Sequence, residues 1–384
     1  MRSSPSSALR RASLFLIDNS LLLLIGAVTA LVWANLAHDS YERFAHAMHF
    51  VVNDIGMVFF FAIAAKEVFE ATLPGGPLAS ARTAAMPLLA AAGGMVGPAL
   101  LYLTLVWTQG LPALTRGWAI PCATDIAFSY LVARFIFGGG HPAVPFLLML
   151  AIADDAMGLM ILAIFYPSGA LRPLEGVVLL AAAIGVAMLL RRQRVINFWP
   201  YVLLAGGLSW AALFVGGLHP ALALVPIVPM MPHAKRDLGF FDNREDVRHD
   251  TLNEFEHWWK APVEVILFFF GLVNAGVPFA SVGPGTWIVL AAILAGKPVG
   301  IGLFTVLGAV LSLRVTGGLT WRDVVVVGTV AGIGFTVALF FATAAFEPGQ
   351  LLDQTKMGAL FSFCAALLAV GGAAVLRVGR FGRR

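Results

Sequence analysis

Long apolar segments, separated by short polar or glycine- and proline-containing turns, dominate this sequence. A helix needs about 20 apolar residues to cross a hydrocarbon core about 30 Å thick. Windows of that length give twelve candidate spans, at 14–36, 51–69, 84–108, 118–137, 144–165, 174–190, 199–215, 218–232, 261–277, 286–313, 322–346 and 355–376. The only long polar stretch is 233–260. The pattern predicts an all-α integral membrane protein whose single transmembrane domain covers residues 1–384.

The composition is that of a membrane protein and excludes most classes of soluble protein. The chain has 384 residues, of which 59% are hydrophobic and 12% charged, whereas a soluble domain is about 45–50% apolar and about 25% charged. A net charge of +4 is too small to indicate a nucleic-acid partner. Cys122 and Cys364 lie in apolar runs, which argues against a disulfide framework or a zinc site. No cofactor is predicted.

The placement of Lys and Arg predicts the orientation in the membrane. If the segments between spans alternate sides, 19 of the 25 basic residues fall on one side, four on the other and two within spans. Basic residues concentrate on the cytoplasmic side, so both termini and the polar stretch 233–260 are predicted to be cytoplasmic. The first span imitates a signal peptide, with Arg10 and Arg11 before an apolar run. Removing it would leave eleven spans and disturb the charge bias, so we expect it to be retained.

Two adjacent acids, Asp154 and Asp155, lie in the middle of an apolar stretch, 146–165, that has no other charge. An ionisable residue at this depth costs at least about 2.5–3.5 kcal/mol and marks a functional site by default. Helical neighbours point about 100° apart, so both acids can border one aqueous cavity without clasping each other. Carboxylates suit hard monovalent cations, and burial beside a like charge favours a bound proton. The pair predicts a site where cations and protons compete.

Other charges also fall within the predicted spans. Lys297, in the tenth span, can neutralise the negative carboxyl ends of broken helices or pair with Asp154. Asp54, Glu67 and Glu264 lie near predicted helix ends. For these three acids, a solvated or capping role is as good an interpretation as a functional one.

Two spans carry signals for an interrupted helix. Pro121 precedes Thr124 and Asp125 in the fourth span, where a hydroxyl and an acid can cap a new helix start; a plain proline kink is the alternative. Gly332 and Gly334 weaken the eleventh span, although glycine also serves close helix packing. The two spans hold corresponding places in spans 3–5 and 10–12, as in transporters built from inverted-topology repeats.

Four strings in this order carry a family resemblance: 119–128 (AIPCATDIAF), 151–155 (AIADD), 296–301 (GKPVGI) and 332–336 (GIGFT). Together they resemble the NhaA-type sodium/proton antiporter family, and the similarity extends over nearly the whole chain. None of the strings would suffice alone, but the combination is highly specific.

The resemblance implies twelve helices, with spans four and eleven unwound and crossing near the membrane midplane. It implies that Asp154 and Asp155 bind the cation and the protons, that Thr124 and Asp125 belong to the helix break, and that Lys297 is the family's buried lysine. Members of the family export Na⁺ or Li⁺ across the bacterial inner membrane with the inward proton gradient. They move more protons than cations, so transport is electrogenic.

The match to the family is incomplete among the cytoplasmic-side residues that family members use to respond to pH. Glu67 is retained from an acidic and basic run after the second span, most of which is absent here. His219, Glu256 and His257 match further positions, whereas Lys260 stands in place of a second histidine. These four matching residues are therefore candidates for a pH response rather than a complete pH-sensing set.

Partners and other function classes follow from the same residues. Na⁺, Li⁺ and H⁺ are the expected substrates, and the lipid bilayer is the expected surroundings. Residues 37–50 are few for the hairpin that some family members use to dimerise, so the sequence does not decide whether the protein forms a homodimer. Intramembrane aspartyl proteases need acids on two helices, and prenyltransferases need a third acid where this chain has Gly158, so an enzyme is not expected. The remaining alternative is a sodium-coupled symporter of an organic anion.

Overall fold

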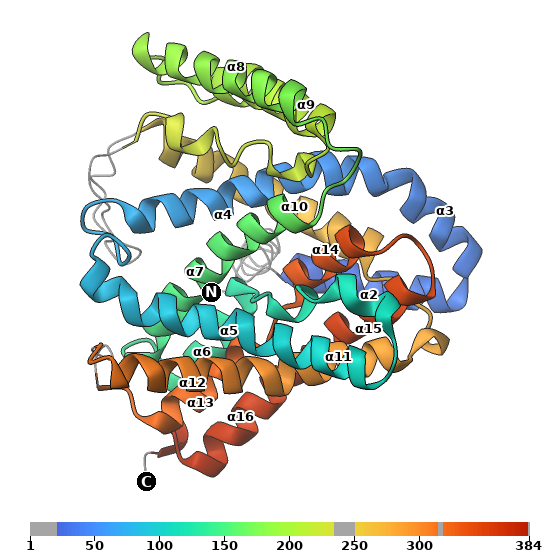
Figure 1. Ribbon diagram of the computed structural model, residues 1–384, viewed down its shortest axis with the longest axis vertical. Helices are drawn as coiled ribbons and strands as arrows, with labels where there is room; N and C mark the ends of the chain where they lie inside the picture. Colours follow the sequence, from blue (N-terminus) through green and yellow to red (C-terminus); the bar gives the residue numbers. More distant parts are fainter. Residues whose placement is uncertain (1–20, 234–249, 314–317, 383–384) are drawn as a thin grey trace, which may run out of the picture.

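The computed structural model describes residues 21–233, 250–313 and 318–382, and every element in these ranges is a helix (Figure 1). The α-helices are α2 (Leu21–Leu36), α3 (His38–His49), α4 (Met57–Thr72), α5 (Ala81–Thr108), α6 (Ile126–Phe137), α7 (Ala143–Phe165), α8 (Pro173–Arg192), α9 (Gly207–Gly216), α10 (Thr251–Asn274), α11 (Pro284–Ala291), α12 (Lys297–Val310), α13 (Trp321–Ala331), α14 (Phe335–Ala345), α15 (Gln350–Phe361) and α16 (Cys364–Leu376). Turns of π-helix lie at Phe50–Gly56, Tyr201–Gly206 and Ala292–Gly296. Turns of 3₁₀-helix lie at Pro112–Gly117, Ile120–Cys122, Pro220–Leu222, Val228–Met230, Phe279–Ser281 and Gly379–Gly382.

Six helices in these ranges are long and apolar enough to cross a membrane, or up to eight if each of two bent pairs counts as one span. The bent pairs are Pro112–Cys122 with Ile126–Phe137 and Trp321–Ala331 with Phe335–Ala345. The all-helical class is as predicted, and the count of twelve spans stays a prediction. Residues 14–20 of the first predicted span and 234–249 of the predicted polar loop lie outside the described residues.

The structure corrects three of the predicted segments. The eighth span, 218–232, is no continuous helix but a series of turns, because Pro220, Pro226, Pro229 and Pro232 each remove an amide donor. The stretch 37–50, predicted to lie between two spans, is helical from His38 onward and joins α4 in one helix, His38–Thr72. The polar stretch 233–260 contains the start of α10 at Thr251, where the Asp250 side chain accepts a hydrogen bond from Asn253 N.

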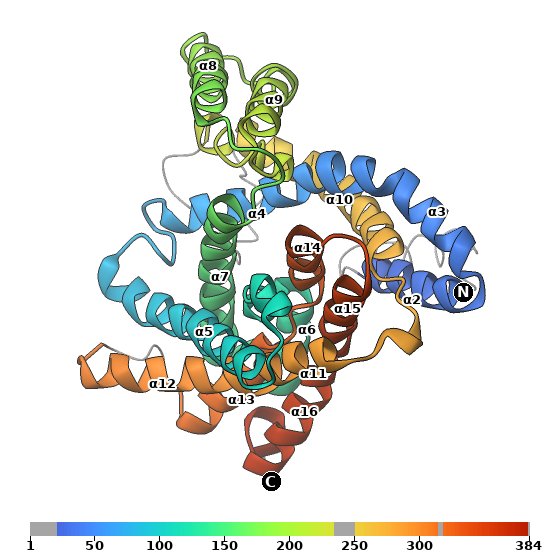
Figure 2. The same ribbon diagram turned by 45° about the vertical axis from the view of Figure 1, so that its right-hand side comes forward.

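The second helix of each bent pair, α6 and α14, lies at the centre of the molecule (Figure 2). Figure 2 shows α4, α7, α5, α11 and α10 around these two helices. The α8–α9 hairpin projects from one end in both views. Its two helices approach closely, since a β-carbon at Gly176 would lie 2.8 Å from Gly216 Cα.

Helices α5 and α12 pack backbone against backbone through four glycines. A β-carbon at Gly93 would lie 2.3 Å from Gly300 O, and one at Gly300 would lie 2.1 Å from Gly93 O. Further along the contact, a β-carbon at Gly97 would lie 2.3 Å from Gly296 O. Small residues allow this approach in membrane helices, where packing replaces the hydrophobic effect as the driving force for association. We call this contact the glycine seam; it fixes the start of α12, and therefore Lys297, against α5.

Replacing Gly300 by Ala is expected to destabilise the protein by about 1–3 kcal/mol, because the new methyl group would overlap a backbone oxygen that cannot move aside. Thermal unfolding in detergent measures the loss. Gly302→Ala is the matched control on the same helix, since no atom lies within 4 Å of its β-carbon position. Equal melting temperatures for the two variants would contradict the role given to the glycine seam.

Candidate functional site

The two bent helix pairs meet at their breaks. The first pair bends by 54° and the second by 50°. Asp125 N donates a hydrogen bond of 2.7 Å to Ile333 O, so the extended segment after Pro121 pairs with the segment between α13 and α14. A β-carbon at Gly334 would lie 2.5 Å from Ala123 O, so only glycine allows the two segments to approach this closely. The predicted interruptions at Pro121 and at Gly332 and Gly334 coincide with these two bends.

The Asp125 carboxylate joins the amino-terminal ends of α6 and α14. Its Oδ1 accepts a hydrogen bond of 3.3 Å from Phe128 N as the cap of α6. Its Oδ2 accepts from the Thr336 hydroxyl and, at 3.4 Å, from Thr336 N in the first turn of α14. Both helix starts carry partial positive charge, and a carboxylate between them compensates both. This position explains how an acid only 6% exposed can stay buried.

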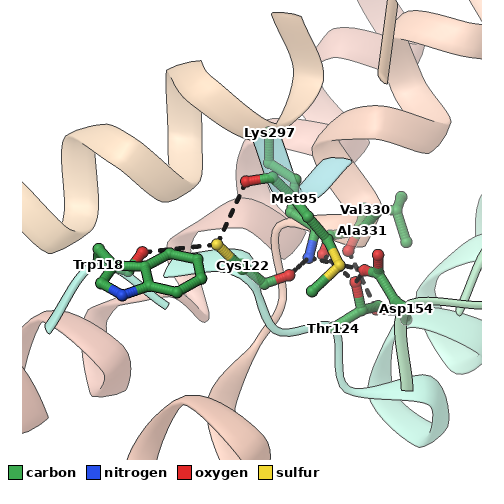
Figure 3. A network of polar contacts seen from close by, with 9 residues as sticks. Met95, Trp118, Cys122, Thr124, Asp154, Lys297, Val330 and Ala331 are labelled. Carbon is green, nitrogen blue, oxygen red and sulfur yellow. Dashed lines mark hydrogen bonds and ion pairs between the residues drawn. The ribbon is translucent and has the colours of Figure 1, made fainter. Parts of the chain in front are cut away.

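Asp154 is held by side chains from two other elements (Figure 3). Its Oδ2 accepts a hydrogen bond of 2.5 Å from the Thr124 hydroxyl and lies 3.0 Å from Lys297 Nζ. Lys297 also donates to the Cys122 carbonyl, which the helix break leaves without an α-helical partner. Lys297 is fully buried and Asp154 is 3% exposed. Thr124, Asp154 and Lys297, singled out from the sequence, therefore form one cluster.

The second acid, Asp155, is half-buried and lines a narrow pocket together with Asp154 and Thr124. Four aromatic rings form much of the rest of the lining, Phe60, Phe61, Phe340 and Phe341. The pocket has room for about one water molecule or a single alkali cation. The two acids share this pocket but differ in their surroundings, because Asp154 already has a lysine partner.

The candidates for a pH response do not form one cluster. Glu256 on α10 accepts from Lys66 on α4, which also lies 2.6 Å from Glu70. Glu67, one residue further on α4, is half-buried. His257 is exposed.

His219 lies away from this group, before the 3₁₀ turn Pro220–Leu222, where its ring accepts a hydrogen bond of 3.3 Å from Ala221 N. The ring centroids of His219 and Phe340 are 4.8 Å apart, so His219 packs behind one wall of the pocket.

The structure corrects the placement of two acids that were expected near helix ends. Asp54 lies in the π-helical turn Phe50–Gly56, inside the continuous helix His38–Thr72, and Glu264 lies within α10 and is 9% exposed. The continuation of α3 into α4 and the early start of α10 are the reasons, since both move the helix ends away from these residues.

Three contacts of the site could not be read from the sequence. Thr336 was visible only as the end of the GIGFT string, and its hydroxyl becomes a partner of Asp125. The Cys122 carbonyl can accept a hydrogen bond from Lys297 only because the helix stops there. Lys66 carried a weak signal, a glutamate four residues later, but nothing pointed to Glu256.

This geometry combines two carboxylates at a pocket with the fully buried ammonium group of Lys297 and two interrupted helices. The sequence model of Na⁺/H⁺ antiporter 1 matches residues 17–376. The chain belongs to this family.

Relatives of the family cover almost the whole chain. A Na⁺/H⁺ antiporter NhaA from Jannaschia sp. (strain CCS1) is 49% identical over 402 residues, covering 93% of this chain and 96% of that protein. A second, NhaA 1 from Pelobacter propionicus, is 48% identical over 370 residues, covering 94% of this chain and 97% of that protein. The family resemblance predicted from the four strings is confirmed. With its apolar helices, the chain is a multi-pass membrane protein of the antiporter family.

A solved structure shares the fold at much lower identity. The sodium proton antiporter MjNhaP1 from Methanocaldococcus jannaschii matches with a TM-score of 0.58 at 16% identity, covering 94% of this chain and 91% of that chain. At this identity the likeness concerns the arrangement of helices alone.

Replacing Thr336 by Val is expected to lower stability by about 1–3 kcal/mol, because it removes the hydroxyl donor of a buried carboxylate. Thermal unfolding in detergent is the measurement. Thr329→Val provides the control, since the Thr329 hydroxyl bonds to Val325 O within its own helix. If Thr336→Val unfolds no earlier than Thr329→Val, Asp125 does not depend on this contact.

Proposed function

We propose that this chain is a secondary antiporter of the bacterial inner membrane that exchanges cytoplasmic Na⁺ or Li⁺ for external H⁺, with both termini in the cytoplasm. The observation that carries the proposal is the pair Asp154 and Asp155 at one narrow pocket, in a member of an antiporter family. Carboxylates bind either a proton or a hard cation, so one site can exchange the two species by competition.

The two acids take different parts in this scheme. Asp155 has no lysine partner within ion-pair distance among the described residues, and it lines the pocket; it is the first ligand for the cation. Asp154 adds a second carboxylate and is balanced by Lys297 at 3.0 Å. Thr124 holds the side chain of Asp154 from the broken helix at 2.5 Å. Because the acids repel each other, their protons leave and return as a coupled pair.

Alternating access turns this competition into transport. With the site open to the cytoplasm, the deprotonated acids bind Na⁺. The site then opens outward, where a higher proton concentration displaces the cation, and the protonated form returns. Exchange without leak requires that only the cation-loaded or the protonated site changes sides, which fits a narrow, aromatic-lined pocket that disfavours uncompensated charge.

Lys297 and the broken helices support the charges that appear and disappear in this cycle. When Asp154 is protonated, Lys297 still has the Cys122 carbonyl as partner. Asp125 keeps the two helix starts together. Gly332 and Gly334 lie at the break between α13 and α14, where Gly334 lets Ala123 O approach closely. We also propose that Glu67, His219, Glu256 and His257 adjust the rate to pH. The geometric support is that His219 packs against Phe340 of the pocket lining and that Glu256 binds Lys66, the neighbour of Glu67 on α4.

A sodium-coupled symporter of an organic anion is the alternative. An organic anion would require a basic group in the pocket, but its charged lining residues are Asp154 and Asp155, and Lys297 is engaged by Asp154. The chemistry of the lining therefore favours cations. The antiporter names of the relatives favour a transporter over an enzyme.

Replacing Asp155 by Asn is expected to abolish exchange while leaving insertion and folding intact, because the amide retains the shape of the side chain but cannot bind a cation by charge. Everted vesicles with an imposed pH gradient report the activity when Na⁺ is added without any organic solute. Asp353→Asn, on α15 beside Ser281, is the control and should keep the activity. Robust exchange by Asp155→Asn would defeat the site assignment, and a Na⁺ response that needs an organic anion would favour the symporter.

Transport is expected to move net positive charge inward, since more protons enter than cations leave. Proteoliposomes with a Na⁺ gradient test this when the membrane potential is clamped with K⁺ and valinomycin. The initial rate should rise when the clamp is applied, because charge no longer accumulates against further turnover. Rates that do not respond to the clamp would indicate electroneutral exchange.

A further inference from the structure

The glycine seam contains an internal sequence repeat. On α5 the residues are Gly93-Gly94-Met95-Val96-Gly97, and at the start of α12 they are Gly296-Lys297-Pro298-Val299-Gly300. The contacts are reciprocal, because the first glycine of each string meets the last glycine of the other. Reciprocal contacts of this kind are the property of a twofold axis, here an internal one that relates the two helices.

This relation pairs Gly94 with Lys297. Both positions follow the first glycine of their string, and both lie beside Asp154. Lys297 Nζ lies 3.0 Å from Asp154 Oδ2. On the other side, a β-carbon at Gly94 would lie 3.8 Å from Asp154 Oδ1. The carboxylate thus has a lysine on one side and a residue without a side chain on the other.

The two oxygens of Asp154 are satisfied very differently. Oδ2 has the Thr124 hydroxyl and Lys297 as partners, whereas Oδ1 is buried and has no hydrogen-bond partner among the described residues. A buried oxygen of an ionised group costs free energy when it has no partner. Asp154 is 3% exposed, and only one of its two oxygens has partners. The other oxygen, Oδ1, can therefore bind one more ligand.

Helix packing alone does not require glycine at position 94. The β-carbons of Gly93 and Gly97 would overlap backbone oxygens, which cannot yield. The atoms nearest to a β-carbon at Gly94 would be Ile301 Cγ1 at 3.1 Å and Cδ1 at 3.3 Å, followed by Asp154 Oδ1 at 3.8 Å. The two closest atoms belong to a side chain and not to the backbone. The glycine at 94 therefore has a different role from the glycines on either side of it.

We propose that Gly94 keeps Oδ1 of Asp154 free of protein partners, and that this oxygen is the one Asp154 gives to the transported cation. The inference rests on the proposed antiport and names an atom and a residue within it. A second lysine at the symmetric position would clamp both oxygens and leave Asp155 to bind the cation alone. A small side chain that carries a hydrogen-bond donor would have a milder effect of the same kind. Gly94 is thus a positioning residue for cation affinity.

Gly94→Ser and Gly94→Ala form a matched pair that separates hydrogen bonding from volume. Both add a β-carbon, but only the serine hydroxyl can donate to Oδ1 and compete with the cation. We expect the KM for Na⁺ of Gly94→Ser to be about tenfold higher than that of Gly94→Ala, equivalent to about 1.4 kcal/mol. The maximal rates should be similar. Exchange is measured in proteoliposomes over a range of Na⁺ concentrations, and Na⁺ binding to purified protein is measured by calorimetry.

Steric strain is controlled with a second background. Ile301→Val removes Cδ1, which would lie 3.3 Å from the new β-carbon, and leaves Cγ1 as the end of a shorter side chain. The serine and alanine variants are therefore also compared on Ile301→Val, with thermal unfolding as a check on folding. A tenfold difference in KM and in calorimetric affinity that persists in this background supports the proposal.

Two results would overturn the proposal. Na⁺ affinities of the serine and alanine variants that both equal the affinity of the unsubstituted protein would show that Oδ1 need not stay free. Affinities of the two variants that are reduced by the same factor in both backgrounds would assign Gly94 to packing. Failure of the antiport itself is recognised separately, because the unsubstituted protein would then show neither exchange nor Na⁺ binding.

Discussion

The buried ion pair between Lys297 and Asp154 is the contact on which the arrangement of this site depends. A fully buried ammonium group is sustained only by close compensation, because desolvation costs several kcal/mol per ion. Lys297 obtains this from one carboxylate oxygen and from the Cys122 carbonyl. The carbonyl is free to accept because Pro121 and the extended residues after it end the local helix. The helix break, the lysine and the acid therefore require one another.

The same requirement for partners explains why the two bent helix pairs meet at their breaks. A helix that stops within a membrane leaves amide and carbonyl groups without partners, and these must be satisfied inside the protein. Here the broken segments satisfy each other, through the hydrogen bond from Asp125 N to Ile333 O and through the Asp125 carboxylate at both helix starts. Thr124 links this crossing to Asp154, so backbone polarity and side-chain charge form one network.

The sequence was sufficient for features that carry a large local cost. Asp154, Asp155 and Lys297 were identifiable because charge in an apolar run is expensive, and the two breaks because proline and paired glycines weaken a helix. Contacts between distant segments, such as Thr336 with Asp125, depend on the fold and left no local signal.

Two predictions about helices were wrong, and the sequence itself contains the reason in each case. The prolines in 218–232 argued against a continuous helix, but the hydropathy of the window outweighed them. The start of α10 is marked by Asp250, a residue type that favours helix caps, yet the polar character of 233–260 suggested a loop. Hydropathy finds segments that can enter a membrane, whereas the ends of helices follow capping chemistry that extends beyond the apolar core.

Close backbone packing also indicates which parts of the molecule can move against each other. The glycine seam joins α5 to α12, and a second contact of this kind joins α2 to α10, where a β-carbon at Gly26 would lie 2.1 Å from Phe268 O. Lys66 ties α4 to this second unit through Glu256. The pocket is lined by residues of α4, α5, α7 and α14, with Phe61 of α4 and Phe340 of α14 in edge-to-face contact at 4.9 Å. Contacts between two backbones hold their helices in a fixed relation, whereas aromatic side chains can slide and change rotamer. The lining can therefore yield at Phe61 and Phe340, while the glycine seam keeps Lys297 fixed against α5.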